Sequence, residues 1–279
     1  MKSVNQERIN IAIRWIMFTA SICGMGLVAA LFPLEGNLPL IVIPSVLVLL
    51  FSKPVFFEKL KLTTLVTMRI LIIFAALNMF HKQLYVNIIL IMLMINILEA
   101  TLTDIFRYKR YLNGISGIVL TIAVCALSGV WSNTASVGDF YIVGGAGLAA
   151  SLCYIIAYTI WNWIFVTNEF SSSVAFMHVG FLLAPIIGCI LTLWMGPAAG
   201  FGMWLLLRAN TLAIGGWMQI AAKSWFETEF YSPNFEKFVA WTKKDHVQFV
   251  LMVINLVLLG YCIYASVHAG TFAFPNLFI

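Results

Sequence analysis

An arginine in the middle of an apolar segment is the residue of this chain whose chemistry most needs an explanation. Residues 200–222 are long enough to cross a bilayer, and Arg208 lies roughly halfway along them. Thr211, Gly215 and Gln219 follow it at helical spacing and therefore share its face of a helix. An arginine at mid-bilayer costs at least ~2.5–3.5 kcal/mol on insertion scales, so it rarely faces lipid. We expect Arg208 to meet a carboxylate, backbone carbonyls, water or a ligand.

A carboxylate in another apolar segment is the second candidate. Asn96, Glu99 and Thr103 lie three and four residues apart within residues 84–106, so they share one helix face. Glu99 would lie about 10 Å from the cytoplasmic end of that helix, given its rise per residue. Two interpretations remain open. Glu99 forms a structural ion pair with Arg69 of the preceding segment, or it is a proton or cation site whose protonation is coupled to a conformational change.

The densest group of polar and aromatic side chains lies near the end of the segment 140–166. One helical face there carries, in chain order, Tyr154, Tyr158, Asn162 and Glu169. Asn162 is the deeper amide, and two roles fit it equally: a hydrogen bond between helices, or a place in the lining of a binding site.

A histidine near the start of the next apolar segment completes the set. His178 is predicted at the depth of Glu169 and Gln219, and Pro185 can kink its helix where a cavity needs room. A lone histidine can equally be a packing residue. Matching depths predicts a cavity that is open toward the cytoplasm, with Arg208 at its deep end. Its walls would come from the segments 84–106, 140–166, 174–194 and 201–222.

Composition defines the elements that must position these residues. The chain has 279 residues, of which 62% are hydrophobic and only 10% charged, whereas about a quarter of a soluble domain is charged. This composition predicts an all-α polytopic membrane protein whose residues 1–279 form a single transmembrane domain. We predict nine transmembrane helices. Their segments are 11–32, 38–51, 62–80, 84–106, 115–131, 140–166, 174–194, 201–222 and 249–268.

The distribution of lysine and arginine predicts the orientation. With the N-terminus in the cytoplasm, twelve of the sixteen Lys and Arg residues fall in cytoplasmic loops. Lys82 alone falls outside, and Arg14, Arg69 and Arg208 lie within spans. Nine spans then place the C-terminus outside.

The longest loop, residues 223–245, is predicted to be cytoplasmic and to contain an interfacial amphipathic helix. Ser232 is a typical N-cap and Pro233 a typical first helical residue. Phe235 and Phe238 would share one face of this helix, which suits a position at the lipid headgroups.

Several classes of function are disfavoured. The five cysteines lie in apolar runs without a CxxC motif, so we expect neither a metal site nor a cofactor. Basic residues interleaved with aromatics are not found outside the apolar segments, so we expect no nucleic-acid partner. The expected partners are membrane lipids and a small-molecule substrate.

Two functions are the main candidates, beside a receptor, assembly factor or scaffold. In the first, the protein is a multi-pass carrier of a small anionic solute in the plasma membrane. Its substrate-binding residues would be Arg208, Asn162, Gln219 and Tyr158. Glu99 and His178 would couple transport to protons. In the second, the protein is a membrane-embedded enzyme acting on a lipid or other apolar substrate from the cytoplasmic side, with His178 and Glu169 as acid–base pair and Arg208 stabilising an anion.

Overall fold

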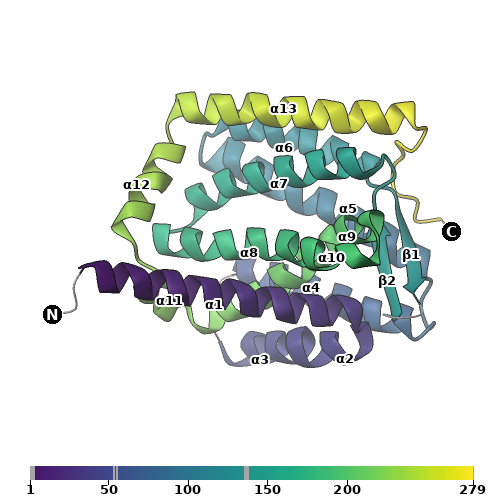
Figure 1. Ribbon diagram of the computed structural model, residues 1–279, viewed down its shortest axis with the longest axis horizontal. Helices are drawn as coiled ribbons and strands as arrows, with labels where there is room; N and C mark the ends of the chain where they lie inside the picture. The colour runs from purple at the N-terminus through teal and green to yellow at the C-terminus, as the bar shows by residue number, and fades with distance from the viewer. Residues whose placement is uncertain (1–3, 53, 55, 135–137, 279) are drawn as a thin grey trace.

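A computed structural model describes residues 4–52, 54, 56–134 and 138–278 (Figure 1). About 82% of the chain is helical, which agrees with the predicted all-α membrane class. Among the described residues, six helices are long and apolar enough to cross a membrane. They span Arg8–Leu31, Pro33–Phe51, Lys82–Arg107, Leu148–Glu169, Ser172–Leu191 and Asp245–His268. The count of nine spans and their orientation stay predictions.

The elements follow one another along the chain in this order: α1 (Val4–Leu31), α2 (Pro33–Asn37), η1 (Leu38–Val42), α3 (Ile43–Phe51), α4 (Phe56–Ala76), α5 (Lys82–Leu102), η2 (Thr103–Arg107), α6 (Tyr111–Ala123), η3 (Val124–Ala126), β1 (Gly129–Thr134), β2 (Gly138–Val143), α7 (Leu148–Glu169), α8 (Ser172–Leu191), η4 (Leu193–Met195), α9 (Pro197–Gly202), α10 (Trp204–Ala221), α11 (Lys223–Glu229), α12 (Pro233–Thr242) and α13 (Asp245–His268).

Three of the nine predicted segments correspond to helices outside the group of six. Helix α4 carries Arg69 and a charged first turn, α6 is only 13 residues long, and α10 is 18 residues long with Arg208 inside it. Each is nonetheless a continuous helix of the bundle.

A β-hairpin is the feature that the helical segmentation missed. β1 and β2 pair antiparallel, with Trp131 opposite Tyr141. The predicted segments 115–131 and 140–166 were therefore wrong at their adjoining ends, where strands replace helix. The run from Phe140 to Val143 is aromatic and β-branched, which favours extended backbone. Gly147, with φ at +89°, then separates the sheet from the start of α7.

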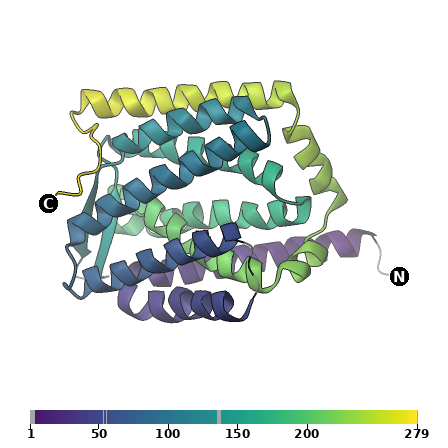
Figure 2. The same cartoon turned by 180° about the vertical axis from the view of Figure 1, so that it is seen from behind.

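The helices run antiparallel between two distinct ends. Helices α11 and α12 lie at one end with the N-terminus, and the hairpin lies at the other with the C-terminus (Figure 1, Figure 2). The basic residues Arg107 and Lys223 stand where η2 ends and α11 begins, at the α11–α12 end. Lys82, in contrast, begins α5 at the hairpin end.

Helix α10 is held closely between α1 and α8. A Cβ atom added at Gly215 would lie 2.3 Å from Cζ of Phe181, so only glycine lets α10 approach the α8 ring this closely. On the other side of α10, Asn210 donates a hydrogen bond from Nδ2 to the carbonyl oxygen of Gly26 at 3.0 Å. This packing fixes how Arg208 is presented inside the bundle.

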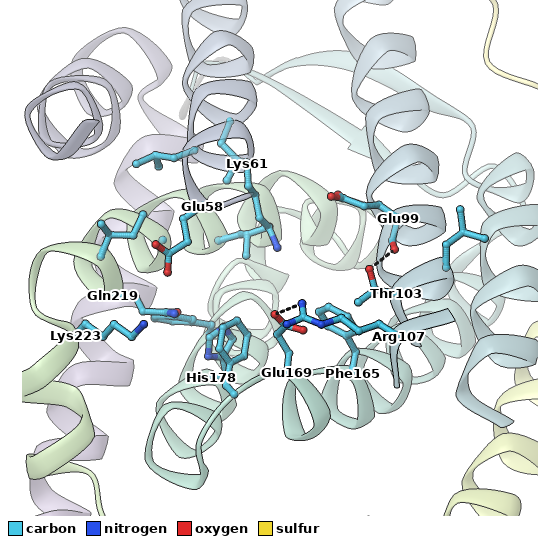
Figure 3. Close-up of a pocket in the computed structure, with 18 of the residues that line it drawn as sticks. Glu58, Lys61, Glu99, Thr103, Arg107, Phe165, Glu169, His178, Gln219 and Lys223 are labelled. Atoms are coloured by element: carbon cyan, nitrogen blue, oxygen red, sulfur yellow. Dashed lines mark hydrogen bonds and ion pairs between the residues drawn. The ribbon is translucent and has the colours of Figure 1, made fainter. Parts of the chain in front are cut away.

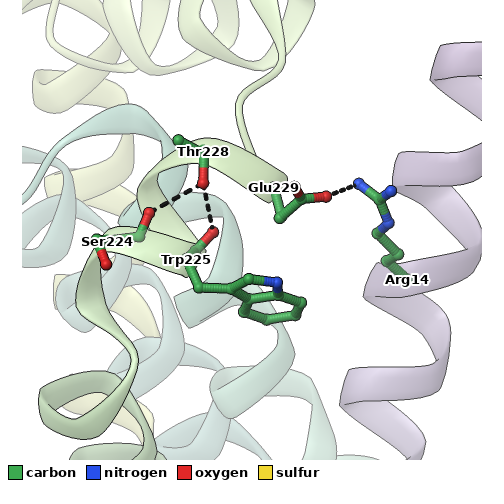
Figure 4. Close-up of polar contacts among 5 residues, drawn as sticks. All are labelled: Arg14, Ser224, Trp225, Thr228 and Glu229. Atoms are coloured by element: carbon green, nitrogen blue, oxygen red, sulfur yellow. Dashed lines mark hydrogen bonds and ion pairs between the residues drawn. The ribbon is translucent and has the colours of Figure 1, made fainter.

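The predicted loop 223–245 contains two helices. Arg14 of α1 forms an ion pair with Glu229 of α11, while the Thr228 hydroxyl donates to the carbonyl of Ser224 one turn earlier in the same helix (Figure 4). Helix α12 begins at Pro233, and the rings of Phe235 and Phe238 both lie 5.7 Å from Trp163 of α7. Its aromatic face thus packs against the end of the bundle.

Candidate functional site

A cavity of about 740 Å³ lies within the α11–α12 half of the bundle, between α4, α5, α7, α8 and α10 (Figure 3). Predicted residues from four different helices line it together: Glu99, Glu169, His178 and Gln219. The four predicted wall segments all contribute, and α4 is a fifth wall. Apolar side chains such as Phe165, Phe181 and Leu212 form much of the remaining surface.

The charged groups of the cavity are arranged by depth. Glu58, Arg107, Glu169 and Lys223 stand at or near helix ends and form the mouth. Lys61 and Glu99 lie deeper and point toward the same space from α4 and α5 (Figure 3). Three carboxylates and three cationic side chains line the cavity among the described residues, so the site presents both signs of charge on apolar walls.

The suggested ion pair between Glu99 and Arg69 is wrong. Glu99 interacts electrostatically with Lys61 instead. Arg69 is directed to α10, where its Nη1 donates to Oδ1 of Asn210. Arg69 therefore does not share the depth of Glu99 as the sequence suggested: Glu99 lines the cavity, whereas Arg69 contacts Asn210.

Glu169 is held at the mouth by two neighbours from the end of η2. Its Oε2 accepts a hydrogen bond from the Tyr108 hydroxyl, and its Oε1 lies 3.7 Å from Nη1 of Arg107. Burial and the hydrogen bond to Glu169 raise the pKa of the Tyr108 phenol to about 12. The phenol therefore stays protonated and continues to donate at neutral pH.

His178 is buried between aromatic rings. Its ring stacks on Phe170 at 4.9 Å and meets Phe181 edge-on at 5.1 Å. Nδ1 lies 3.0 Å from the Val174 carbonyl, which makes Nδ1 the donor in a neutral ring. The lone pair then belongs to Nε2, and no hydrogen bond joins His178 to Glu169 among the described side chains.

Arg208 lies behind Phe181 with two of its predicted companions. Its Nη2 donates to Oδ1 of Asn162 and its Nη1 to the Phe181 carbonyl, both at 3.4 Å. Its guanidinium carbon lies 5.7 Å from the ring centre of Tyr158. Arg208 is only 3% exposed, and no ion pair reaches it from the described part of the chain. Asn162 and Tyr158 thus hold Arg208 and do not line the cavity wall.

Sequence reasoning missed two polar groups of this half of the molecule. Lys61 was assigned to a loop because the start of α4 is rich in charge, although α4 begins five residues earlier at Phe56. Asp104 is fully buried in η2, where its Oδ2 accepts a 2.6 Å hydrogen bond from Asn113. The short spacing between Asp104 and Asn113 could have suggested that pair.

The side chains that could ligate a metal ion are dispersed over the described part of the structure. Over the ranges that the structure describes, no three His, Cys, Asp or Glu side chains converge on one point. The five cysteines are not paired with one another.

Comparison with known proteins gave no relative: no protein-family model, no curated protein and no solved structure matches this chain. Fold and site together define a polytopic helical membrane protein with a charged cavity in one half and a buried arginine beneath it.

Proposed function

We propose that the protein is a carrier that moves a small anionic solute across the plasma membrane. The proposal includes nine spans, a cytoplasmic N-terminus and an external C-terminus. The basic residues at the ends of η2 and α11 support this orientation, because positive charge favours the cytoplasmic side. The cavity then opens to the cytoplasm.

The observation that carries the proposal is Arg208. A buried guanidinium whose two hydrogen bonds are both 3.4 Å long is weakly satisfied, since such bonds are normally 2.7–3.2 Å. An anionic group that entered past Phe181 would supply the missing charge and shorter, charge-assisted bonds. Asn162 and Tyr158 orient the guanidinium for this contact, and Gln219 offers an amide in the cavity before it.

In the proposed orientation, two aromatic rings would close the outer side of the cavity. Tyr158 and Trp204 meet edge-to-face at 5.0 Å beyond the cavity, and both are buried. The charged residues Glu58, Arg107, Glu169 and Lys223 line the cavity at the α11–α12 end, so in the proposed orientation the conformation would be the inward-facing state of an alternating-access cycle.

Proton coupling would use the pair of charges on α4 and α5. Protonation of Glu99 removes the negative charge that faces Lys61 and frees the lysine to meet the solute or to let the helices separate. His178, with its Nε2 lone pair, is the second proton acceptor beside the cavity.

An enzyme acting on a lipid or other apolar substrate is the alternative, and the apolar walls with the basic Nε2 of His178 favour it. The engagement of Glu169 by Tyr108 and Arg107 disfavours it, because Glu169 is not bonded to His178 as an acid–base partner.

A ligand screen by thermal unfolding tests the proposal on the purified protein. Small organic anions and, separately, lipids are added to the wild type, to Arg208→Gln and to the matched control Arg14→Gln, which removes an arginine outside the cavity. A ligand at a hundred times its dissociation constant stabilises the folded state by about 2.7 kcal/mol. We expect at least one organic anion to stabilise the wild type and Arg14→Gln but not Arg208→Gln. Stabilisation by lipids alone would refute the carrier and direct attention to lipid conversion.

A further inference from the structure

A second polar cluster lies in the opposite half of the bundle, beside the hairpin. It consists of Arg69 on α4, Tyr85 near the start of α5, Tyr141 on β2 and Asn210 on α10. Arg69 and both tyrosines are 0% exposed. Neither the cavity nor the Arg208 group includes Arg69 or either tyrosine.

Arg69 is a fully buried cation without a counter-charge. Its Nη1 donates to the amide oxygen of Asn210, which carries no charge. No carboxylate forms an ion pair with Arg69 within the described ranges, and its Nε and Nη2 have no hydrogen-bond partner. A buried charge in this condition is strongly unfavourable unless something compensates it.

Further donors surround the guanidinium. The hydroxyls of Tyr85 and Tyr141 have no hydrogen-bond partner, and both interact electrostatically with Arg69. The two rings meet edge-to-face at 5.7 Å, and Trp131 lies 6.0 Å from Tyr85 with its indole N–H also unpartnered. The unsatisfied groups of this half are thus two tyrosine hydroxyls, one indole N–H and two guanidinium nitrogens, and each of them can donate a hydrogen bond.

The geometry of the free guanidinium edge selects the ligand. Nε–H and Nη2–H form the parallel fork that matches two oxygens of a planar oxyanion. A tyrosine hydroxyl can donate to a third oxygen. A water molecule would accept hydrogen bonds without compensating the charge of Arg69, whereas a planar oxyanion does both.

We propose that Arg69, Tyr85 and Tyr141 bind a small planar oxyanion, of the size of formate, nitrate or bicarbonate, in the hairpin half of the membrane domain. The ligand is a free anion of this size, because Arg69, Tyr85 and Tyr141 are fully buried. This site goes beyond the carrier function and does not depend on it, because the two arginines have different partners. Arg208 contacts Phe181 and Asn162, whereas Arg69 contacts Asn210.

Thermal unfolding of the full-length protein in lipid nanodiscs measures this binding directly. Sodium formate and sodium nitrate are titrated at constant ionic strength against sodium gluconate, which is too large for a buried site. The variants are Tyr141→Phe and the control Tyr154→Phe, whose hydroxyl is also buried and unpartnered but lies on α7 away from Arg69. Arg208→Gln is the third, because it separates this site from the proposed solute site.

We expect saturable stabilisation by formate and nitrate in the wild type, Tyr154→Phe and Arg208→Gln. In Tyr141→Phe the half-saturating concentration should rise about tenfold or more, since one hydrogen bond to a charged group is lost. Equal responses to gluconate and formate in the wild type would overturn the proposal and leave the donors to structural water. A response that survives in Tyr141→Phe but disappears in Arg208→Gln would also overturn it, by locating the anion at Arg208.

Discussion

The contact between α10 and α8 gives the sharpest test of the packing, because two adjacent glycines of α10 differ completely in their surroundings. A Cβ atom at Gly215 would lie 2.3, 2.5 and 2.6 Å from three atoms of the Phe181 ring. A Cβ atom at Gly216 would meet its nearest neighbour, Cδ1 of Leu62, at 3.9 Å. The same methyl group is therefore an overlap at one position and an ordinary contact at the next.

The loss of stability in Gly215→Ala depends on how firmly its neighbours hold the Phe181 ring. Phe181 is 1% exposed and lies between Phe18 at 5.5 Å and His178 at 5.1 Å, so it cannot turn away without moving both. Overpacking of this kind costs about 1–3 kcal/mol. Replacing a helical glycine by alanine returns about 0.5–1 kcal/mol. Gly215→Ala should thus lose about 0–2.5 kcal/mol overall and be about 1–3 kcal/mol less stable than Gly216→Ala, which should be neutral or stabilised.

Thermal unfolding of both variants in the same detergent measures the difference. Gly215→Ala should unfold at a lower temperature than the wild type, and Gly216→Ala should not. Ligand binding should weaken in Gly215→Ala as well, because the displaced Phe181 ring lines the cavity. Equal unfolding temperatures for the two variants would refute the close approach of α10 and α8.

Two further predictions concern polar contacts at the α11–α12 end. A double-mutant cycle with Arg14→Gln and Glu229→Gln, followed by thermal unfolding, should give a coupling free energy of about 0.2–1 kcal/mol, because both side chains are partly exposed. A larger coupling free energy would mean that the pair is shielded from solvent. Asn113→Leu should lower the free energy of unfolding by about 1–3 kcal/mol, because Asp104 loses the hydrogen bond that Asn113 donates. The double variant Asp104→Leu/Asn113→Leu should unfold at a higher temperature than Asn113→Leu alone. No loss in the single variant would contradict a buried, hydrogen-bonded Asp104.

The sequence predicted which residues need polar surroundings better than it predicted their partners. Burial of a charge in an apolar helix is costly, so Arg208 had to have companions, and Asn162 and Tyr158 do contact it. Arg69 also has a polar partner, but that partner is Asn210 of α10 and not Glu99 of the neighbouring segment. Helical periodicity gives the face of a residue, whereas the choice of neighbouring helix depends on packing between distant segments.

The predicted segment boundaries were wrong where a strand and a helix can have the same apolar composition. The run from Phe140 to Val143 is apolar enough for a span, yet its aromatic and β-branched residues form a strand of the hairpin. Lys61 was missed for the opposite reason: hydropathy placed the charged start of α4 in a loop, while the helix carries it into the cavity wall. Apolar content alone therefore marks a segment as buried without fixing its backbone.

Counterflow in proteoliposomes tests the central claim most directly. The purified protein is reconstituted and loaded with an unlabelled anion identified by the unfolding screen, and entry of the labelled anion is followed. The carrier account predicts rapid, saturable exchange by the wild type and by Arg14→Gln, and at least a tenfold slower exchange by Arg208→Gln. Tight binding of the anion by the wild type without any exchange, or its chemical conversion inside the vesicles, would contradict transport.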